Sequence, residues 1–233
     1  DLPVRDALLR AFPSRAVADV AVVAIDEESL GSEGPWPWSR ARLSAVAKAA
    51  RGAGGRALAL DLLLVALSDG DDVLAGSLRR MPSILAAGLD AKAGWLFPSP
   101  ALRGAGKLAE TSFDVDHDGV VRRLSSTKQR DGTSLPALSV AAASLAVETP
   151  GPIPVGRVLV PDFRSRPGEV PVVGASRLLA DRAGDVLRGR IVFLGVTAAG
   201  LGDRFVTPGS PAGTPEPGVL VHAAAASALL AGG

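Results

Sequence analysis

The chain has 233 residues and a mass of 23.6 kDa, enough for one domain that buries its own core. Its 25 basic and 24 acidic residues nearly cancel, so nucleic acid is not expected as a partner. The absence of Cys excludes disulfides, thiolate metal sites and cysteine nucleophiles, and the 47% hydrophobic content excludes a disordered chain.

The first part of the chain alternates apolar runs with helical patterns. Residues 17–25 are almost continuously apolar, as expected of a strand that is buried on both faces. Ser39 is a good helix N-cap, and the apolar residues of 43–50 follow at the spacing of one helix face. A second buried strand is predicted at 57–64, which gives a β-α-β unit with parallel strands.

The rest of the chain continues this alternation with one exception. A helix that begins after Asp69 leads to a strand at 83–89, whereas two β-type runs within 111–127 flank an Asp-Gly turn and predict an antiparallel hairpin. The later elements are a helix from Pro136, a strand at 157–160, a helix from Ser176, a strand at 190–194 and a helix at 219–230. We therefore expect one α/β domain over residues 1–233, a three-layer sandwich with a mostly parallel central sheet, flanking helices and one antiparallel hairpin.

No apolar run reaches the roughly 18 residues that a membrane span needs. The chain starts at Asp1 without a Met or a signal-peptide pattern, which we interpret as a piece of a longer protein.

Seven short motifs follow one another along most of the chain. They are AID at 24–26, WPWSR at 36–40, LD at 60–61, DHDGVVRR at 116–123, RIVFLG at 190–195, Asp203 with TP at 207–208, and PGV at 217–219 followed by HA at 222–223. In this order and spacing the chain resembles the CHASE type-2 domain, a sensory module of bacterial adenylate cyclases, histidine kinases, Ser/Thr kinases and diguanylate cyclases. The match is weakest at 125–154.

The resemblance implies an extracytoplasmic domain that lies between membrane-spanning helices of an inner-membrane receptor. It further implies an input domain, not an enzyme, that binds an unknown small-molecule or protein signal and relays it to a cytoplasmic cyclase or kinase. We expect a homodimer that shifts between two packings and is joined to its own transmembrane helices outside these residues.

Two carboxylates come at or near the carboxyl ends of predicted buried strands, where ligands bind in open α/β sheets. Asp26 follows the first strand and Asp61 belongs to the second. Such a pair could hold Mg²⁺ or share a proton. The alternative is structural: each carboxylate accepts hydrogen bonds from loop amides or pairs with Arg40.

Two of the three Trp residues, Trp36 and Trp38, stand beside Arg40 in an aromatic-poor chain. Flat rings beside a guanidinium would suit a ligand pocket or a partner surface, whereas the alternative is a lid that buries apolar area. Asp203 and Thr207 fall in a loop expected at the same sheet edge. The predicted ligand-binding set is Asp26, Trp36, Trp38, Arg40, Asp61, Asp203, Thr207 and His222.

The spacing D-x-D-x-D-G at 114–119 is that of the opening of an EF-hand calcium loop, with Asp114, Asp116 and Asp118 as candidate calcium ligands. The pattern is incomplete, because its twelfth position is Ser125 instead of Glu and two arginines intervene. A hairpin turn explains the Asp-Gly pair equally well.

Two other function classes remain open beside the sensor. One is a metal-dependent hydrolase that uses Asp26, Asp61, Asp203 and His222, although no complete catalytic motif occurs. The other is a dimerisation module that binds no ligand. No cofactor is expected apart from a possible Ca²⁺ or Mg²⁺ ion.

Overall fold

The computed structural model describes residues 2–14, 17, 19–92, 94–146, 155–211 and 213–232. The helices are α1 (Leu2–Ala11), α2 (Glu27–Glu33), α3 (Arg40–Gly52), α4 (Asp71–Leu78), α5 (Pro100–Arg103), α6 (Leu138–Ser144), α7 (Ala175–Leu179) and α8 (Gly218–Leu230), with a 3₁₀ helix at Pro167–Glu169. The strands are β1 (Val20–Ile25), β2 (Ala57–Asp61), β3 (Ser83–Asp90), β4 (Gly94–Leu96), β5 (Lys107–Glu110), β6 (Leu124–Ser125), β7 (Thr127–Arg130), β8 (Thr133–Pro136), β9 (Val158–Leu159), β10 (Val172–Gly174), β11 (Ile191–Val196), β12 (Arg204–Phe205) and β13 (Glu216–Pro217).

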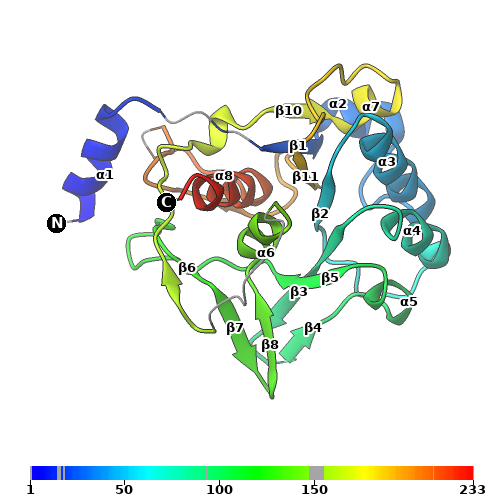
Figure 1. The fold of residues 1–233 in the computed structure, drawn as a ribbon, viewed down its shortest axis with the longest axis horizontal. Helices are drawn as coiled ribbons and strands as arrows, with labels where there is room; N and C mark the ends of the chain where they lie inside the picture. The colour runs from blue at the N-terminus through cyan, green and yellow to red at the C-terminus, as the bar shows by residue number, and fades with distance from the viewer. Residues whose placement is uncertain are drawn as a thin grey trace.

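A mostly parallel sheet forms the centre of the molecule (Figure 1). Its strand order is β10-β1-β11-β2-β3-β4, and β5 also pairs with β3. Every pairing in this sheet is parallel except that of β3 with β4. Because β1, β11 and β2 lie side by side and run the same way, their carboxyl ends meet at one edge, as the β-α-β pattern predicts.

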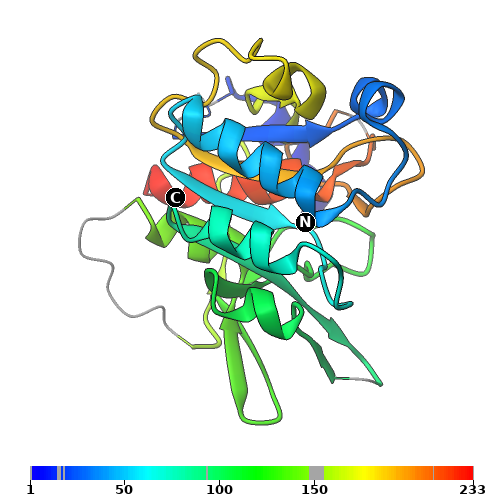
Figure 2. The ribbon, with the colours of Figure 1, turned by 90° about the vertical axis from the view of Figure 1, so that its right-hand side faces the viewer.

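Alternate residues of the central strands face two separate cores. In β1, Val23 and Ile25 pack toward α3, α4 and α7, whereas Val20 and Val22 pack toward α6 and α8. Figure 2 shows α3 and α4 in front of the sheet and α8 behind it. The expected three-layer α/β sandwich is confirmed.

Helix α8 is buried around almost its whole circumference. Val219 and Ala223 pack against the sheet, while Val221 and Ala225 face a third apolar cluster on the opposite side. The small side chains allow close packing, and a Cβ added at Gly195 of β11 would lie only 2.7 Å from the Cβ of Val219. This close approach places the first turn of α8 directly beside the carboxyl end of β11.

The predicted hairpin within 111–127 is only partly formed. The Asp-Gly turn is present, since the amide of Gly119 donates to the carbonyl of Asp116. The two arms are joined by a hydrogen bond from the amide of Asp116 to the carbonyl of Val120 and by an isolated bridge between Asp114 and Arg123, and within the described residues they do not form paired strands. The true hairpin is β7–β8, which turns at Asp131 and Gly132. Both turn residues have positive φ, as a two-residue hairpin loop requires.

Two other predicted elements differ from the structure. Pro136 ends β8 instead of opening a helix, and α6 begins two residues later. The strand predicted at 157–160 is the short β9, which pairs with β6 outside the central sheet. Among the described residues, no helix combines the length and apolarity required to cross a membrane.

Candidate functional site

A cavity of about 290 Å³ lies at the carboxyl edge of the central sheet. Its floor is formed by the ends of β2 and β11, and its walls by the loops after β2 and β5, the approach to β12 and the first turns of α8. The lining residues are Trp36, Asp61, Leu62, Leu63, Thr111, Phe113, Val196, Gly202, Asp203, Phe205, Gly218, Val219 and His222. Four of the predicted site residues, Trp36, Asp61, Asp203 and His222, therefore meet here.

Asp61 is the last residue of β2 and stands opposite Gly195 in the sheet register. Its side chain accepts no hydrogen bond from the part of the chain that the structure describes, and it does not pair with Arg40 as one alternative had it. Burial, together with the negative charge of Asp203, raises the pKa of Asp61 to about 7. The cavity thus contains a carboxyl group whose charge has no partner.

His222 lies on α8 with both ring nitrogens occupied. Its Nε2 is 3.0 Å from the carbonyl oxygen of Thr111, and its Nδ1 is 3.0 Å from the hydroxyl of Ser139. Because a carbonyl only accepts, Nε2 carries the proton and the neutral ring accepts from Ser139 at Nδ1. Burial lowers the pKa of His222 to about 4, so the ring is uncharged at neutral pH. His222 is therefore a buried histidine whose two ring nitrogens are hydrogen-bonded within the fold, an arrangement that does not suit a metal ligand.

Aromatic rings form much of the cavity wall. Phe113 stacks on His222 with ring centroids 4.1 Å apart and meets Phe205 edge-on at 4.7 Å. Trp36 contributes a third aromatic wall and is only partly buried. Its neighbour Trp38 is buried, lies outside the cavity lining and donates through Nε1 to the carbonyl of Gly34 at 2.8 Å. Trp36 therefore lines the pocket, whereas Trp38 buries apolar area as the alternative predicted.

Asp26, Arg40 and Thr207 are not among the residues that line this cavity. Asp26 is the N-cap of α2 and accepts from the amide of Ser29 at 2.8 Å. Arg40 donates from Nε to Asp71 at 2.6 Å and from Nη2 to the carbonyl of Ala66 at 2.9 Å, which ties α3 to the loop before α4.

Thr207 has a structural place as well. It is buried, and its hydroxyl lies 3.1 Å from that of Ser210, which donates in turn to Glu216 at 2.5 Å. Asp26, Trp38, Arg40 and Thr207 therefore do not join the other predicted site residues in this cavity, because hydrogen bonds and, for Arg40, an ion pair hold their polar groups elsewhere.

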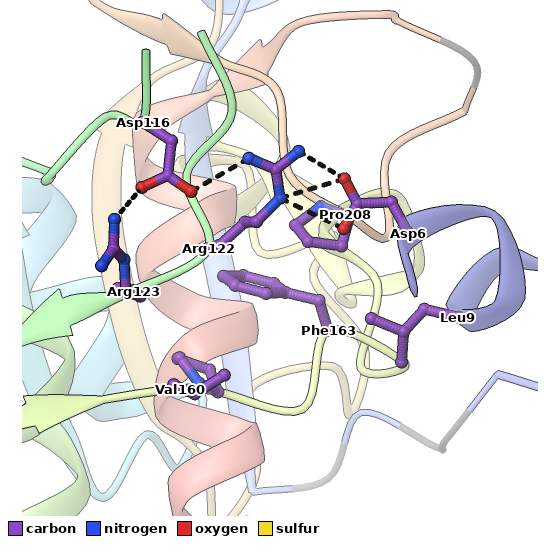
Figure 3. Close-up of a pocket in the computed structure, with 9 residues that line it drawn as sticks. Asp6, Leu9, Asp116, Arg122, Arg123, Val160, Phe163 and Pro208 are labelled. Carbon is purple, nitrogen blue, oxygen red and sulfur yellow. Dashed lines mark hydrogen bonds and ion pairs between the residues drawn. The ribbon is translucent and has the colours of Figure 1, made fainter. Parts of the chain in front are cut away.

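Two of the three predicted calcium ligands, Asp116 and Asp118, pair with arginines, and Figure 3 shows Asp116 in contact with Arg122 and Arg123. Arg122 donates to Asp116 at 2.9 Å, and to Asp118 at 2.8 and 2.7 Å. The same guanidinium reaches Asp6 of α1 at 2.6 Å, and Arg123 also contacts Asp116. The contact with Arg122 lowers the pKa of Asp118 to about 2.

Asp114 turns away from this cluster. It accepts from the amide and hydroxyl of Ser125 at 2.9 and 2.7 Å, and its other oxygen lies 3.2 Å from Lys128. Within the described residues, no group of three His, Asp or Glu side chains could hold a metal ion. The calcium loop expected at Asp114, Asp116 and Asp118 is therefore not formed, and the four residues of the hydrolase hypothesis do not assemble as a metal centre.

The comparison with protein families covers the chain from end to end. The family model of the CHASE2 domain matches residues 1–233. The chain belongs to the CHASE2 domain family. CHASE2 domains are extracytoplasmic sensory domains, which agrees with a signal-sensing domain without catalytic function. No curated protein and no solved structure matches the chain.

Among the residues of this CHASE2 cavity that sequence reasoning missed are Thr111, Phe113 and Phe205. Thr111 and Phe113 follow β5, a strand whose pattern KLAE is too short to stand out. Phe205 belongs to the two-residue strand β12. Had β5 been recognised, its carboxyl end would have placed Thr111 and Phe113 at the ligand-binding edge.

Proposed function

We propose that this chain is the extracytoplasmic input domain of a bacterial transmembrane receptor, and that it relays a stimulus to a cytoplasmic cyclase or kinase. The observation that carries the proposal is the match to the CHASE2 family over all 233 residues. The cavity at the carboxyl edge is the binding site for the signal in this proposal.

The geometry supports a relay from the cavity to the first and last helices of the chain. The loop 111–123 contributes Thr111 and Phe113 to the cavity and holds α1 through the ion pair of Arg122 with Asp6. Helix α8 contributes His222 to the cavity and contacts the same loop. Figure 1 shows α1 and the carboxyl end of α8 on the same side of the molecule. A change in the cavity would thus bias both helices through one loop.

Chemical labelling in cells tests the location. Since the chain contains no Cys, Leu67→Cys provides a single thiol on a side chain that is 77% exposed. In intact cells, or in spheroplasts where an outer membrane is present, we expect a membrane-impermeant maleimide to label this variant as fully as in lysed cells. The parent without Leu67→Cys gives the background, and labelling only after lysis would refute an extracytoplasmic location.

We further propose that the domain self-associates. Val4, Leu8 and Phe12 recur every four residues along α1 and just after it, and each is more than half exposed. A second copy of this chain would cover this apolar stripe. Sedimentation velocity is expected to show a concentration-dependent dimer that Leu8→Glu weakens, whereas a monomer at all concentrations would contradict the proposal.

A further inference from the structure

The charges that line the cavity have one sign. Asp61 and Asp203 both contribute to its wall, and none of its lining residues in the described ranges is Lys or Arg. His222 adds no positive charge, because its hydrogen bonds to Thr111 and Ser139 hold the ring as a buried neutral imidazole. The electrostatic field in the cavity therefore favours a cation.

Several other carboxylates of this molecule are paired with an arginine of the fold. Arg40 reaches Asp71 at 2.6 Å, and Arg122 reaches Asp116 and Asp118 within 2.9 Å. Asp61 lacks both a guanidinium and a hydrogen-bond donor within the described residues, although it stands at a largely covered strand end. Because this carboxylate is only partly buried and faces the cavity, a ligand can supply the N–H donor that the fold does not provide.

The remaining walls suit the hydrocarbon part of an organic cation. Trp36, Phe113 and Phe205 line the cavity, and aromatic faces attract ammonium groups through their π electrons. The volume of about 290 Å³ admits only a small molecule. A hydrated inorganic ion would leave these rings and the side chains of Leu62 and Val196 without contacts.

We propose that this cavity binds a small organic ammonium ion, with its charged group at Asp61 and Asp203 and its hydrocarbon part against the aromatic wall. Binding itself stands on the cavity alone, while the role of the ion as the signal rests on the proposed function. The ammonium N–H groups supply the donors that Asp61 lacks.

A pair of probes with one carbon skeleton isolates the contribution of charge. The chain is titrated calorimetrically at pH 7.5 with 3,3-dimethylbutylamine, which is protonated, and with 3,3-dimethylbutan-1-ol, which is neutral. We expect the ammonium probe to bind at least about tenfold more tightly than the alcohol. A third arm uses choline, whose quaternary nitrogen has no N–H. Binding of choline equal to that of the primary amine would overturn the hydrogen-bond role given to Asp61.

Matched variants place the binding at the cavity. Asp61→Asn and Asp203→Asn should each weaken the ammonium probe at least about fivefold and leave the alcohol unchanged. Asp72→Asn, which removes an exposed carboxylate of α4 outside the cavity, should have no effect. A cooperative thermal unfolding transition is the check that each variant is folded.

Three results would overturn the proposal: equal binding of amine and alcohol, no binding of the amine, or full retention of binding in Asp61→Asn. Stoichiometric uptake of Mg²⁺ at Asp61 in place of the amine would also overturn it. The labelling of Leu67→Cys in cells does not depend on any of these titrations. A failure of ammonium binding is therefore distinguishable from a failure of the sensor proposal.

Discussion

His222 is a neutral side chain held inside the fold, and this makes the domain sensitive to acid. The pKa of His222 falls to about 4 in the folded chain from an ordinary value of 6.5, because burial disfavours the charged ring. The unfolded chain therefore binds the proton first. The contribution of the neutral His222 ring to the stability of the fold is complete above pH 6.5 and is lost as the pH falls from 6.5 toward 4.

We expect this loss to reach about 3 kcal/mol between pH 7 and pH 4. Urea unfolding at several pH values measures it, with His222→Gln as a comparison that lacks the titrating ring. If the free energy of unfolding depends on pH in the same way for both proteins, His222 is not held neutral in the fold.

Asp61 behaves in the opposite way. Its folded pKa of about 7 lies above the ordinary 3.8, so the folded chain holds the proton more tightly than the unfolded chain. Stability attributable to Asp61 is therefore greatest below pH 3.8 and falls as the pH rises through 7. Asp61 costs stability at neutral pH, as expected of a side chain kept for binding.

Asp61→Asn should accordingly stabilise the unliganded domain at pH 8 by on the order of 1 to 3 kcal/mol, with a smaller effect near pH 4. Equilibrium urea unfolding at the two pH values provides the measurement. Destabilisation at pH 8 would mean that Asp61 has a stabilising partner.

At the scale of elements, α8 depends on a close approach to β11. A methyl group at Gly195 would lie 2.7 Å from Val219, so either the helix or the strand must move. Gly195→Ala should destabilise the domain by about 1 to 3 kcal/mol in thermal or urea unfolding. Gly76→Ala in α4 is the matched control, because nothing lies within 4 Å of its added methyl group, and a helix gains up to about 1 kcal/mol from Ala. Equal effects of the two substitutions would contradict this packing.

Helix α1 is held by one buried ion cluster. Asp6→Ala removes the α1 side of the cluster, while Arg122 keeps its bonds to Asp116 and Asp118. We expect the central sheet to keep its hydrogen-exchange protection and α1 to lose most of its own. Unchanged protection of α1 would show that apolar contacts such as that of Leu9 suffice.

Long apolar patterns were predictable from the sequence, and short elements were not. The strands β1, β2, β3 and β11 are buried on both faces, so each is a nearly continuous apolar run of strand length that can be recognised in the sequence. Strands such as β5 and β12 have no such pattern, because tertiary pairing decides their conformation. The Asp131-Gly132 turn did carry a hairpin signal, and Asp116–Gly119 carried a misleading one.

At the scale of the whole molecule, some site residues were predictable from local sequence patterns, whereas others depend on tertiary packing. Asp61 was predictable because it lies in a recognisable strand near its carboxyl end, although the strand ends at Asp61 and not at residue 64 as predicted. Asp203 was predictable because its loop follows the strand beside it. Arg40 was misplaced because its partner, Asp71, lies 31 residues away and depends on how α3 packs on α4. Strand ends can be located from local patterns, whereas the choice of ion-pair partner depends on packing between helices.

The central claim is that ligand binding occurs at the carboxyl edge of the sheet. Hydrogen exchange of the whole chain, with and without saturating 3,3-dimethylbutylammonium, tests it most directly. We predict slower exchange at 61–63, 111–113 and 202–205, and altered exchange in α1 through the loop that ends at Arg122. Protection confined to the smaller cavity of about 160 Å³ around Asp6 and Phe163, with no change at 61–63, would contradict the account.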